Sequence, residues 1–151
     1  MRSLVVVVGQ SLCRRWGASQ IPFTGGSGRV IDAGLALAGI AKDQIFITNV
    51  VHCHPRGDRE SFPEEIEKCS RYLQRELEIV QPRVIVGLVR DAEAVLRPAY
   101  PHARELSWPF VSAPVRRPRA TLSPDLLFPN HPSWVKWQLE WGLCGQRRPG
   151  R

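Results

Sequence analysis

The chain has 151 residues, 43% of them hydrophobic and 23% charged, which is the composition of one soluble globular domain. Its 21 basic residues outnumber the 14 acidic ones, and all but three of the basic residues are arginines. The planar guanidinium of arginine binds phosphate through two hydrogen bonds, so this charge favours a nucleic acid partner over a merely solvated basic surface. No segment has the roughly 20 apolar residues that cross a membrane, and the N-terminal apolar run is shorter than a signal peptide requires. We therefore expect a cytoplasmic protein without a membrane partner.

Short runs of β-branched residues alternate with helical patterns along the chain, which favours a parallel sheet with helices on both faces. The first strand is predicted at Leu4–Val8 and is followed by a long loop over Gly9–Gly26. A helix then begins at Ser27, and its inner face is predicted from the spacing of Val30, Ala33, Leu37 and Ile40. The second strand, Ile45–Thr48, leads into a second long loop over Asn49–Ser61.

The second half of the chain opens with a strong helix signal. The run Ser61–Glu64 has the pattern of a capping box with proline in the first turn. The helix is expected to end before Pro82 and to bury one stripe, formed by Ile66, Cys69, Leu73 and Val80. The remaining predicted elements are a strand at Val84–Val86, a short helix at Ala92–Leu96, an irregular strand near Trp108–Val111, a last strand at Leu126–Phe128 and a helix after Pro129–Ser133. Together they predict a three-layer α/β/α domain over residues 1–144, with a central four-stranded, mainly parallel sheet, and a basic, disordered tail over residues 145–151.

Ligands of parallel α/β sheets bind beyond the carboxyl ends of the strands. Three parts of the chain are predicted to meet there: the loop after the first strand, Asn49 after the second, and His131 after the last. The sequence lacks the glycine-rich patterns of nucleotide-binding loops and the Gly-x-Ser-x-Gly elbow of hydrolases. His52, Cys53 and His54 are adjacent, so in an extended segment they cannot all face one metal ion. The signature of a zinc deaminase is also missing.

Several segments occur in an order and spacing that point to one family. They are Pro22–Gly28, Ile47–Pro55 with Arg59, Glu64–Cys69, Pro82–Val86 and His131–Ser133. Through these segments the chain resembles the uracil-DNA glycosylase superfamily, most closely family 4, its iron–sulfur branch. The resemblance implies a DNA repair enzyme that flips uracil out of the DNA stack and hydrolyses its N-glycosidic bond, leaving an abasic site.

The resemblance also implies which residues contact the base and the DNA. Phe23 would stack on the flipped pyrimidine, and the carboxamide of Asn49 would pair with uracil O4 and N3, because an amide offers both a donor and an acceptor. His131 would donate to uracil O2 and stabilise the negative charge that develops on the leaving base. The residues assigned to DNA contact are Ser27 and Arg59, Ser133 at a phosphate, and Trp134 or Val135 as a wedge in the vacated stack.

The loop after the first strand departs from the family pattern. Gly9–Cys13 reads Gly-Gln-Ser-Leu-Cys, where family 4 typically has Gly-Glu-Ala-Pro-Gly. Ser11 stands where related families have an Asp or Asn that activates water, and a hydroxyl is a poor base near neutral pH. We therefore assign Gln10 and Ser11 to orienting the water, with His131 as the third catalytic residue. Catalysis would then rest on stabilisation of the leaving group and be slow.

The four cysteines, Cys13, Cys53, Cys69 and Cys144, are expected to be free thiols, because the chain has no Cys-x-x-Cys pair and no export signal. Cys53 and Cys69 are sixteen residues apart, which matches the last two cluster ligands of family 4. The first pair of ligands would precede the first strand, and two thiolates cannot hold a cubane cluster alone. We expect no cofactor and no metal unless a cysteine pair lies upstream.

Three hypotheses for the function remain open. The leading one is a monomeric, monofunctional uracil-DNA glycosylase whose partner is uracil-containing DNA; a variant of it excises another deaminated base, such as hypoxanthine. Ser11 motivates the second hypothesis, a protein that binds uracil or abasic DNA with little or no turnover. The third is a truncated reading frame whose missing segment completes the cluster. The sequence does not decide whether the Arg116–Arg119 segment contacts DNA.

Overall fold

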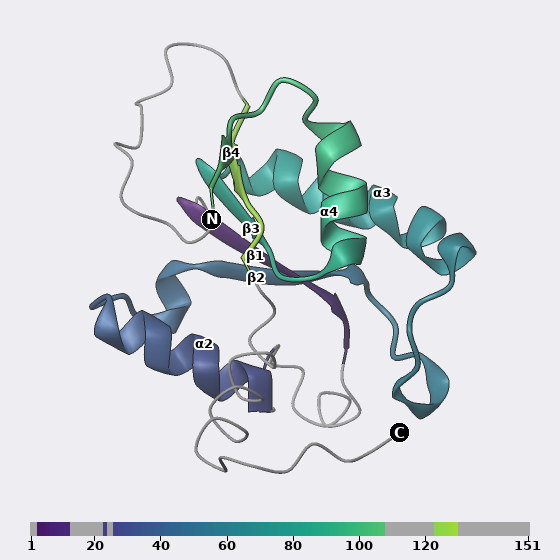
Figure 1. Ribbon diagram of the computed structural model, residues 1–151, viewed down its shortest axis with the longest axis horizontal. Coiled ribbons are helices and arrows are strands. Elements are labelled where there is room, and N and C mark those ends of the chain that lie inside the picture. The colour runs from purple at the N-terminus through teal and green to yellow at the C-terminus, as the bar shows by residue number, and fades with distance from the viewer. Residues whose placement is uncertain (1–2, 13–22, 24–25, 108–122, 130–151) are drawn as a thin grey trace, which may run out of the picture.

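The computed structural model describes residues 3–12, 23, 26–107 and 123–129, and the statements below concern these residues. Their elements are β1 (Val5–Ser11), α2 (Gly26–Leu37), η1 (Lys42–Gln44), β2 (Phe46–Val51), η2 (Arg56–Asp58), α3 (Pro63–Val80), β3 (Val84–Gly87), α4 (Arg90–Ala99), β4 (Glu105–Leu106) and β5 (Asp125–Leu127). The strands form one parallel sheet in the order β2-β1-β3-β5-β4. Figure 1 shows α2 on one face of this sheet and α3 with α4 on the other. No helix in the described ranges combines the length and apolar character that a membrane crossing requires.

The predicted three-layer α/β/α class is confirmed, but the strand number is five rather than four. The additional strand, β4, contains two residues and pairs in parallel with β5 at the edge of the sheet. Two residues are too few to give the alternating pattern by which a strand is recognised in a sequence. The irregular strand predicted at Trp108–Val111, the helix after Pro129–Ser133 and the tail lie outside the described residues.

Two arginines fix this short edge strand to its neighbours. Arg97 of α4 donates from Nε and Nη2 to the two carboxylate oxygens of Glu105, at 2.8 and 2.9 Å, and it also pairs with Glu93. Arg104 makes a second two-point contact, with the carboxylate of Asp125 at the start of β5. Because a planar guanidinium matches the geometry of a carboxylate, each contact holds both orientation and distance.

β1 lies between β2 and β3 in the sheet, and both of its faces are buried. Val6 and Val8 are fully buried on the face covered by α3 and α4, whereas Val7, on the other face, packs with Ile31 and Leu35 of α2. Full burial of an aliphatic side chain of this size contributes about 1.5–3 kcal/mol. The continuous valine run therefore confirms the two-sided burial that the sequence predicts.

β1 and β2 run further than their sequence patterns indicate. β1 continues to Ser11 and β2 to Val51, so Gln10, Ser11 and Asn49 lie in strands, and our prediction that they belong to loops is wrong. The parallel ladder between the two strands includes the pairs Gly9–Asn49 and Ser11–Val51. Backbone pairing between the two strands explains the extension through Gly9, Gln10, Ser11 and Asn49, because glycine and polar side chains give no strand signal of their own.

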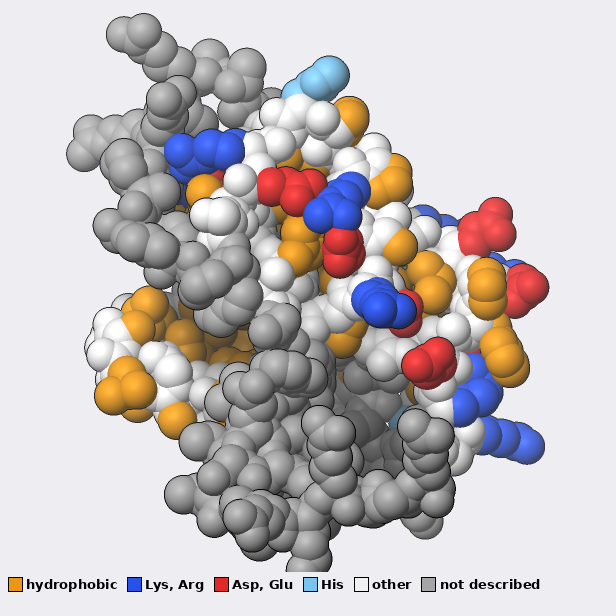
Figure 2. Space-filling view, viewed as in Figure 1, with side chains coloured by type: hydrophobic (Ala, Val, Ile, Leu, Met, Phe, Trp, Pro, Cys, Tyr) orange, Lys and Arg blue, Asp and Glu red, His pale blue; other side chains and the backbone are white. Residues whose placement is uncertain are grey.

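The inner face that we predicted for α2 is wrong. It comprised Val30, Ala33, Leu37 and Ile40. The helix instead packs Ile31 and Leu35 against the sheet, while the side chain of Leu37 is 91% exposed. Hydrophobic side chains are accordingly visible on the outer surface of α2 in Figure 2. In a helix composed mainly of small and apolar residues, the three- and four-residue spacing fits more than one face, and contact with the sheet decides between them.

We expect this difference between the two faces to be measurable. Leu35→Ala should lower the free energy of unfolding by about 1–2 kcal/mol, less than the 2–5 kcal/mol of a fully buried leucine, because Leu35 is only partly buried. Leu37→Gln should change it by less than about 0.5 kcal/mol, since the side chain is exposed. Urea denaturation of both variants checks the prediction. A larger loss of unfolding free energy in Leu37→Gln than in Leu35→Ala would support the inner face predicted from the sequence instead.

The buried stripe predicted for α3 is confirmed, and its members are Cys69, Leu73, Leu77 and Val80, with Ile66 partly buried beside them. The predicted start of the helix is off by one residue. Phe62 rather than Ser61 precedes the first turn, and the carboxylate of Glu65 accepts the Phe62 backbone N–H at 2.8 Å. The Ser61 hydroxyl is instead buried without a hydrogen-bond partner among the described residues. The helix ends at Val80, and its C-cap residue Gln81, just before Pro82, is in the left-handed conformation (φ 49°).

Candidate functional site

The order of the strands defines where a ligand would bind. The chain leaves β1 toward α2 on one face of the sheet and leaves the adjacent strand β3 toward α4 on the other face. The carboxyl ends of β1 and β3 therefore lie at a topological switch point, which is where ligands of open parallel sheets bind. The backbone N–H of Leu88 continues the contact between the two strands by donating to the Val8 carbonyl at 3.0 Å.

Asn49 and Phe23 meet at this edge over Gly9. Asn49 is 5% exposed and stands opposite Gly9 in the ladder between β1 and β2. A Cβ atom on Gly9 would lie 2.5 Å from the Asn49 Oδ1 and 2.6 Å from Cζ of the Phe23 ring. The structure thus brings together two predicted base-binding residues, and the missing side chain of Gly9 makes the room that both occupy. We call these three residues the Gly9 cluster.

The backbone of Phe23 is held in an unusual conformation. Its φ of 55° is left-handed, which costs a residue other than glycine about 1–2 kcal/mol. A Cβ atom on Gly28 would lie 1.6 Å from the Phe23 carbonyl oxygen, so only glycine permits this approach of α2 to the Phe23 backbone. The same carbonyl accepts a hydrogen bond from Nζ of Lys42 at 3.4 Å, and Lys42 is itself paired with Asp32 of α2 at 2.8 Å. Contacts with two separate parts of the chain therefore fix the aromatic ring over Gly9.

Gln10 and Ser11, the predicted water-orienting residues, follow Gly9 in β1. Ser11 is partly buried and pairs with Val51 of β2. Gln10 is partly buried, and Asp91 lies in the first turn of α4. Burial, and then the charge of Glu60, raise the pKa of Asp91, while Gln10 opposes this rise. Sequence reasoning missed Asp91, because nothing in its local pattern indicates a carboxyl group near Gln10.

Arg59, which we assigned to DNA binding, is engaged within the protein. Its two terminal nitrogens donate to the two carboxylate oxygens of Glu65, at 2.9 and 2.7 Å, and its guanidinium lies 3.8 Å from the centre of the Phe62 ring. The hydrogen bond from Arg59 lowers the pKa of Glu65 to about 2. In this arrangement Arg59 holds the loop after β2 to the start of α3, and its contact with DNA stays a prediction.

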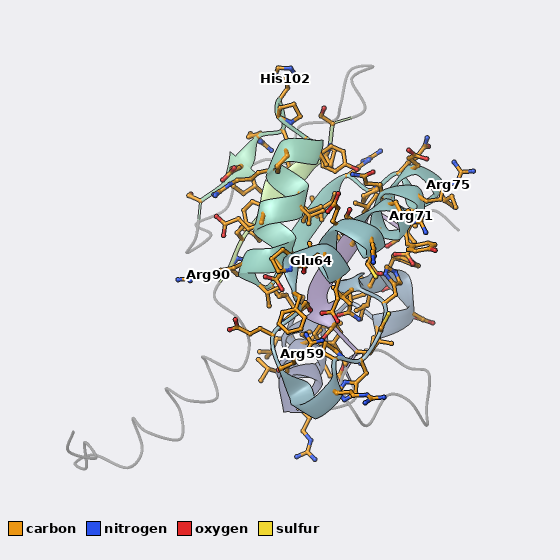
Figure 3. The ribbon with its side chains drawn as sticks, turned by 90° about the vertical axis from the view of Figure 1, so that its right-hand side faces the viewer. Arg59, Glu64, Arg71, Arg75, Arg90 and His102 are labelled. Carbon is orange, nitrogen blue, oxygen red and sulfur yellow. The ribbon has the colours of Figure 1, made fainter. Side chains whose placement is uncertain are left out.

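Two further arginines lie near the same edge and were missed by sequence reasoning. Arg56, in η2, follows β2, and Arg90 begins α4 after β3. Both side chains are exposed, and neither has an ion pair within the residues that the structure describes. Figure 3 shows Arg90 extending outward from the start of α4, whereas Arg71 and Arg75 lie along α3, away from Arg59. Arg56 and Arg90 are thus available to bind phosphate.

A second group of polar residues lies where β2 meets α3. The carboxylate of Glu76 accepts hydrogen bonds from Thr48 Oγ1 at 2.6 Å and from His52 Nε2 at 3.1 Å. Burial disfavours ionisation of Glu76, but these hydrogen bonds and the charge of His52 outweigh it, so its pKa is lowered. His54 turns to another partner, the Leu12 carbonyl, at 2.7 Å. The two histidines thus have different hydrogen-bond partners.

The structure brings Cys53 and Cys69 together. Cys53 is exposed and Cys69 is buried, and burial and then the nearby Cys69 thiol raise the pKa of Cys53. Two thiols are half of the four that a cubane cluster needs, so a role of Cys53 and Cys69 as cluster ligands stays a prediction. No group of three His, Cys, Asp or Glu side chains within those residues is arranged to hold a metal ion. Cys13 and Cys144 lie outside the described part of the chain.

Of the remaining predicted site residues, one lies in α2 and the others follow β5 in the chain. Ser27 lies in the first turn of α2 and is partly buried next to Gly28. β5 ends at Leu127, and the chain is described as far as Pro129. The other assigned residues, His131, Ser133, Trp134 and Val135, lie outside the described residues, so their roles stay predictions.

Comparison with known proteins identifies the family. A sequence profile of the Uracil DNA glycosylase superfamily matches residues 2–141, so the chain belongs to that superfamily. It is 41% identical over 88 residues to the type-4 uracil-DNA glycosylase of Archaeoglobus fulgidus, and this match covers 58% of this chain and 44% of that protein. It is also 41% identical over 72 residues to the Sulfurisphaera tokodaii type-4 uracil-DNA glycosylase (47% and 33% covered) and 34% identical over 84 residues to that of Thermotoga maritima (56% and 44%). These relatives support family 4, although each match spans less than half of the relative's length.

Two glycines of α2 provide a matched test of the Phe23 anchor. Gly28→Ala should lower the free energy of unfolding by about 1–3 kcal/mol, because the new Cβ would overlap the Phe23 carbonyl. Gly34→Ala should raise it by about 0.5–1 kcal/mol, because its Cβ would meet open space and alanine favours a helix. Urea denaturation measures both. Equal effects of the two substitutions would contradict the close approach of α2 to Phe23.

The ion pair of Arg59 predicts how the carboxyl group of Glu65 titrates. Because its folded pKa of about 2 lies below the ordinary 4.5, the ion pair stabilises the fold above pH 4.5, and this stabilisation is lost as the pH falls toward 2. Carbon-13 NMR should show the Glu65 carboxyl titrating near pH 2 in the wild type and closer to its ordinary value in Arg59→Lys, since one ammonium cannot replace the two-point contact. Titration of the wild-type carboxyl near 4.5 would show that the pair does not form in solution.

Proposed function

We propose that this protein is a monofunctional uracil-DNA glycosylase of DNA repair, which hydrolyses the N-glycosidic bond of uracil in DNA and leaves an abasic site. One observation carries the proposal: the carboxamide of Asn49 and the ring of Phe23 converge over Gly9 at the switch point, in a chain of this superfamily. The type-4 uracil-DNA glycosylases to which it is similar support the same reaction.

The Gly9 cluster suits recognition of a base that has left the DNA stack. A flipped pyrimidine would lie against the Phe23 ring, which supplies an apolar face for stacking. The Asn49 amide would donate to uracil O4 and accept from N3–H, a pattern that cytosine reverses. Asn49 is buried in a strand and packed against Gly9, so its amide is oriented before a base arrives. This preorganisation favours uracil over cytosine without a further rearrangement.

The proposed reaction breaks the bond between C1′ of deoxyribose and N1 of uracil. The bonding electrons pass to the base, and a donor at uracil O2, assigned to His131, stabilises the resulting anion until it takes up a proton. A water molecule forms the new bond to C1′ and releases its proton to solvent. Gln10 and Ser11 lie beside Gly9 in β1 and would orient this water. Because a serine hydroxyl is a poor base, the leaving group provides most of the catalysis and the reaction is slow.

Binding of DNA would rest on phosphate contacts around this edge. Arg56 and Arg90 would neutralise phosphates on either side of the flipped nucleotide, with Ser27 and Ser133 as hydrogen-bond donors. The formal net charge of +7 supports association with a polyanion. Each phosphate neutralised by an arginine contributes about 0.9 to the slope of log affinity against log salt concentration on duplex DNA.

The proposal predicts base release that depends on the Gly9 cluster. Wild-type protein should cleave uracil-containing oligonucleotides after alkaline treatment, whereas Asn49→Ala and His131→Ala should each lower the rate by about 10²–10³-fold. Leu37→Gln, an exposed position on α2, is the matched control and should keep the wild-type rate. The panel should include single- and double-stranded uracil DNA, hypoxanthine and thymine mispairs, so that the preferred base is identified.

Ser11 favours one other candidate function, binding of uracil-containing or abasic DNA without turnover. A wild-type protein that binds such DNA in a salt-dependent way, yet releases no base from any substrate of the panel, would support this candidate and contradict the glycosylase. Iron content and visible absorbance of the purified protein, and of a chain extended upstream, test the separate expectation that no cluster is required.

A further inference from the structure

The strand that carries Asn49 lies at the border of the sheet. In the strand order β2-β1-β3-β5-β4, β1 is the one strand that pairs with β2 within the described residues. The pair Gly9–Asn49 belongs to this ladder. A border strand has ladder hydrogen bonds along one edge, whereas an inner strand has them along both. Contacts with the helix on its face therefore weigh more in fixing the orientation of β2.

Glu76 of α3 contacts β2 and the residue that follows it at two points. Its Oε2 accepts a hydrogen bond from Thr48 Oγ1 at 2.6 Å, and its Oε1 lies 3.1 Å from His52 Nε2. A carboxylate can only accept, so the histidine Nε2 carries the proton of the second hydrogen bond. Thr48 precedes Asn49 in the chain and His52 follows it, so one carboxylate spans the end of the strand. Figure 1 shows α3 along the face of the sheet opposite α2.

The side chain of Asn49 points to the other face. Thr48 contacts Glu76 of α3, and Val50 is buried in the core cluster that contains Leu73 of the same helix. Successive side chains of a strand alternate between the two faces, so Asn49, between these two residues, faces the side of α2. There it meets the Gly9 cluster. Contacts that hold its neighbours against α3 therefore set the direction of Asn49.

These contacts are sheltered from water. Thr48 is 6% exposed, and the side chains of His52 and Glu76 are 31% and 30% exposed. Burial would raise the pKa of Glu76, but the hydrogen bonds from His52 and Thr48 lower it, so the carboxylate accepts as a charged and therefore stronger partner. The His52 ring also packs near Tyr72, with 6.0 Å between the ring centroids. Its buried Nδ1 has no hydrogen-bond partner among the described residues, which leaves Glu76 as its polar partner there.

We propose that Glu76 is a positioning residue, which clamps β2 on both sides of Asn49 and thereby fixes the direction of the Asn49 amide over Gly9. Glu76 lies on the face of the sheet opposite the Gly9 cluster, so it acts through Thr48 and His52 without touching the base. Its effect on β2 stands on the hydrogen bonds alone, whereas its effect on catalysis rests on the proposed glycosylase function.

Amide hydrogen exchange tests the clamp independently of any activity. Glu76→Ala should raise the exchange rates at Asn49–Val51 by about tenfold and leave those of Val84–Gly87 in β3 unchanged, because the loss is local. Glu67→Ala, the same substitution at an exposed position of α3, is the matched control and should change neither group. Unchanged exchange at Asn49–Val51 in Glu76→Ala, or an equal rise in β3, would overturn the proposal.

Two milder variants separate the hydrogen bonds from the packing, and they also serve if Glu76→Ala folds poorly. Thr48→Val keeps the branched shape of the side chain but loses the donor hydroxyl, and Glu76→Gln keeps one acceptor oxygen. Each should raise exchange at Asn49–Val51 about threefold, since part of the clamp remains. The double variant Thr48→Val with Glu76→Ala should be no worse than Glu76→Ala alone, because the hydroxyl then has no partner to lose. Wild-type exchange in both milder variants, or additive losses in the double variant, would contradict the clamp.

Single-turnover release of uracil tests the positioning role. Glu76→Ala should lower the rate constant about 10- to 100-fold, because small displacements of a positioned group have effects of this size, while the affinity for uracil-containing DNA changes little. Glu76→Gln should recover most of the rate. In an Asn49→Ala background, Glu76→Ala should cause no further loss, since Glu76 acts through Asn49.

The outcomes of the two measurements are distinguishable. A wild-type rate in Glu76→Ala despite faster exchange, or a further loss in the Asn49→Ala background, would contradict the positioning role. A wild type that releases no base but shows the expected exchange pattern would contradict only the glycosylase function.

Discussion

The bare backbone at Gly9 is the constraint on which the site depends. Two side chains from distant parts of the chain occupy the space that a methyl group at this position would fill. The approach of Phe23 in turn requires a left-handed backbone at that residue and a second glycine, Gly28, against its carbonyl group. The absence of a side chain at Gly9, the left-handed backbone of Phe23 and the absence of a side chain at Gly28 thus depend on one another. Each is a condition on backbone geometry rather than on hydrophobicity. This coupling explains why strain of the kind found at Phe23 persists at a functional site.

Polar contacts at the ends of the strands fix the parts of the chain that lie beyond the hydrophobic core. The valines of β1 position the sheet, but they end before the residues that would contact a ligand. Beyond them, the chain is fixed by individual pairs: His54 with Leu12, His52 with Glu76, and Arg59 with Glu65. Each pair contributes little to the free energy of unfolding, because the groups are partly exposed. Their contribution is to orientation, which binding and catalysis require before the substrate arrives.

The layers of the fold could be predicted from the sequence because they depend on local patterns. The valine run of β1 and the apolar stripe of α3 admit one interpretation each, and both are confirmed. The face of α2 could not be predicted, since its apolar residues fit several faces and only contact with Val7 selects Ile31 and Leu35. The edge strand β4 is too short for any periodicity.

The site could be predicted in part, and mainly through the resemblance. Phe23 and Asn49 were identified by their motifs, and the structure shows why they meet. The ion pair between Arg59 and Glu65 could not be predicted from the sequence, since the two residues join a loop to a helix rather than two turns of one helix.

The edge strand β4 has a consequence for encounters between copies of the chain. An uncovered strand at the border of a sheet is a template onto which a foreign strand can add, and natural proteins counter this with short strands and charge. β4 offers two residues, and one of them, Glu105, is already bound by Arg97. A second chain that added here would have to pair with a very short ladder beside a fixed ion pair. The short length of β4 and the ion pair at Glu105 therefore disfavour the association of two chains through this edge of their sheets.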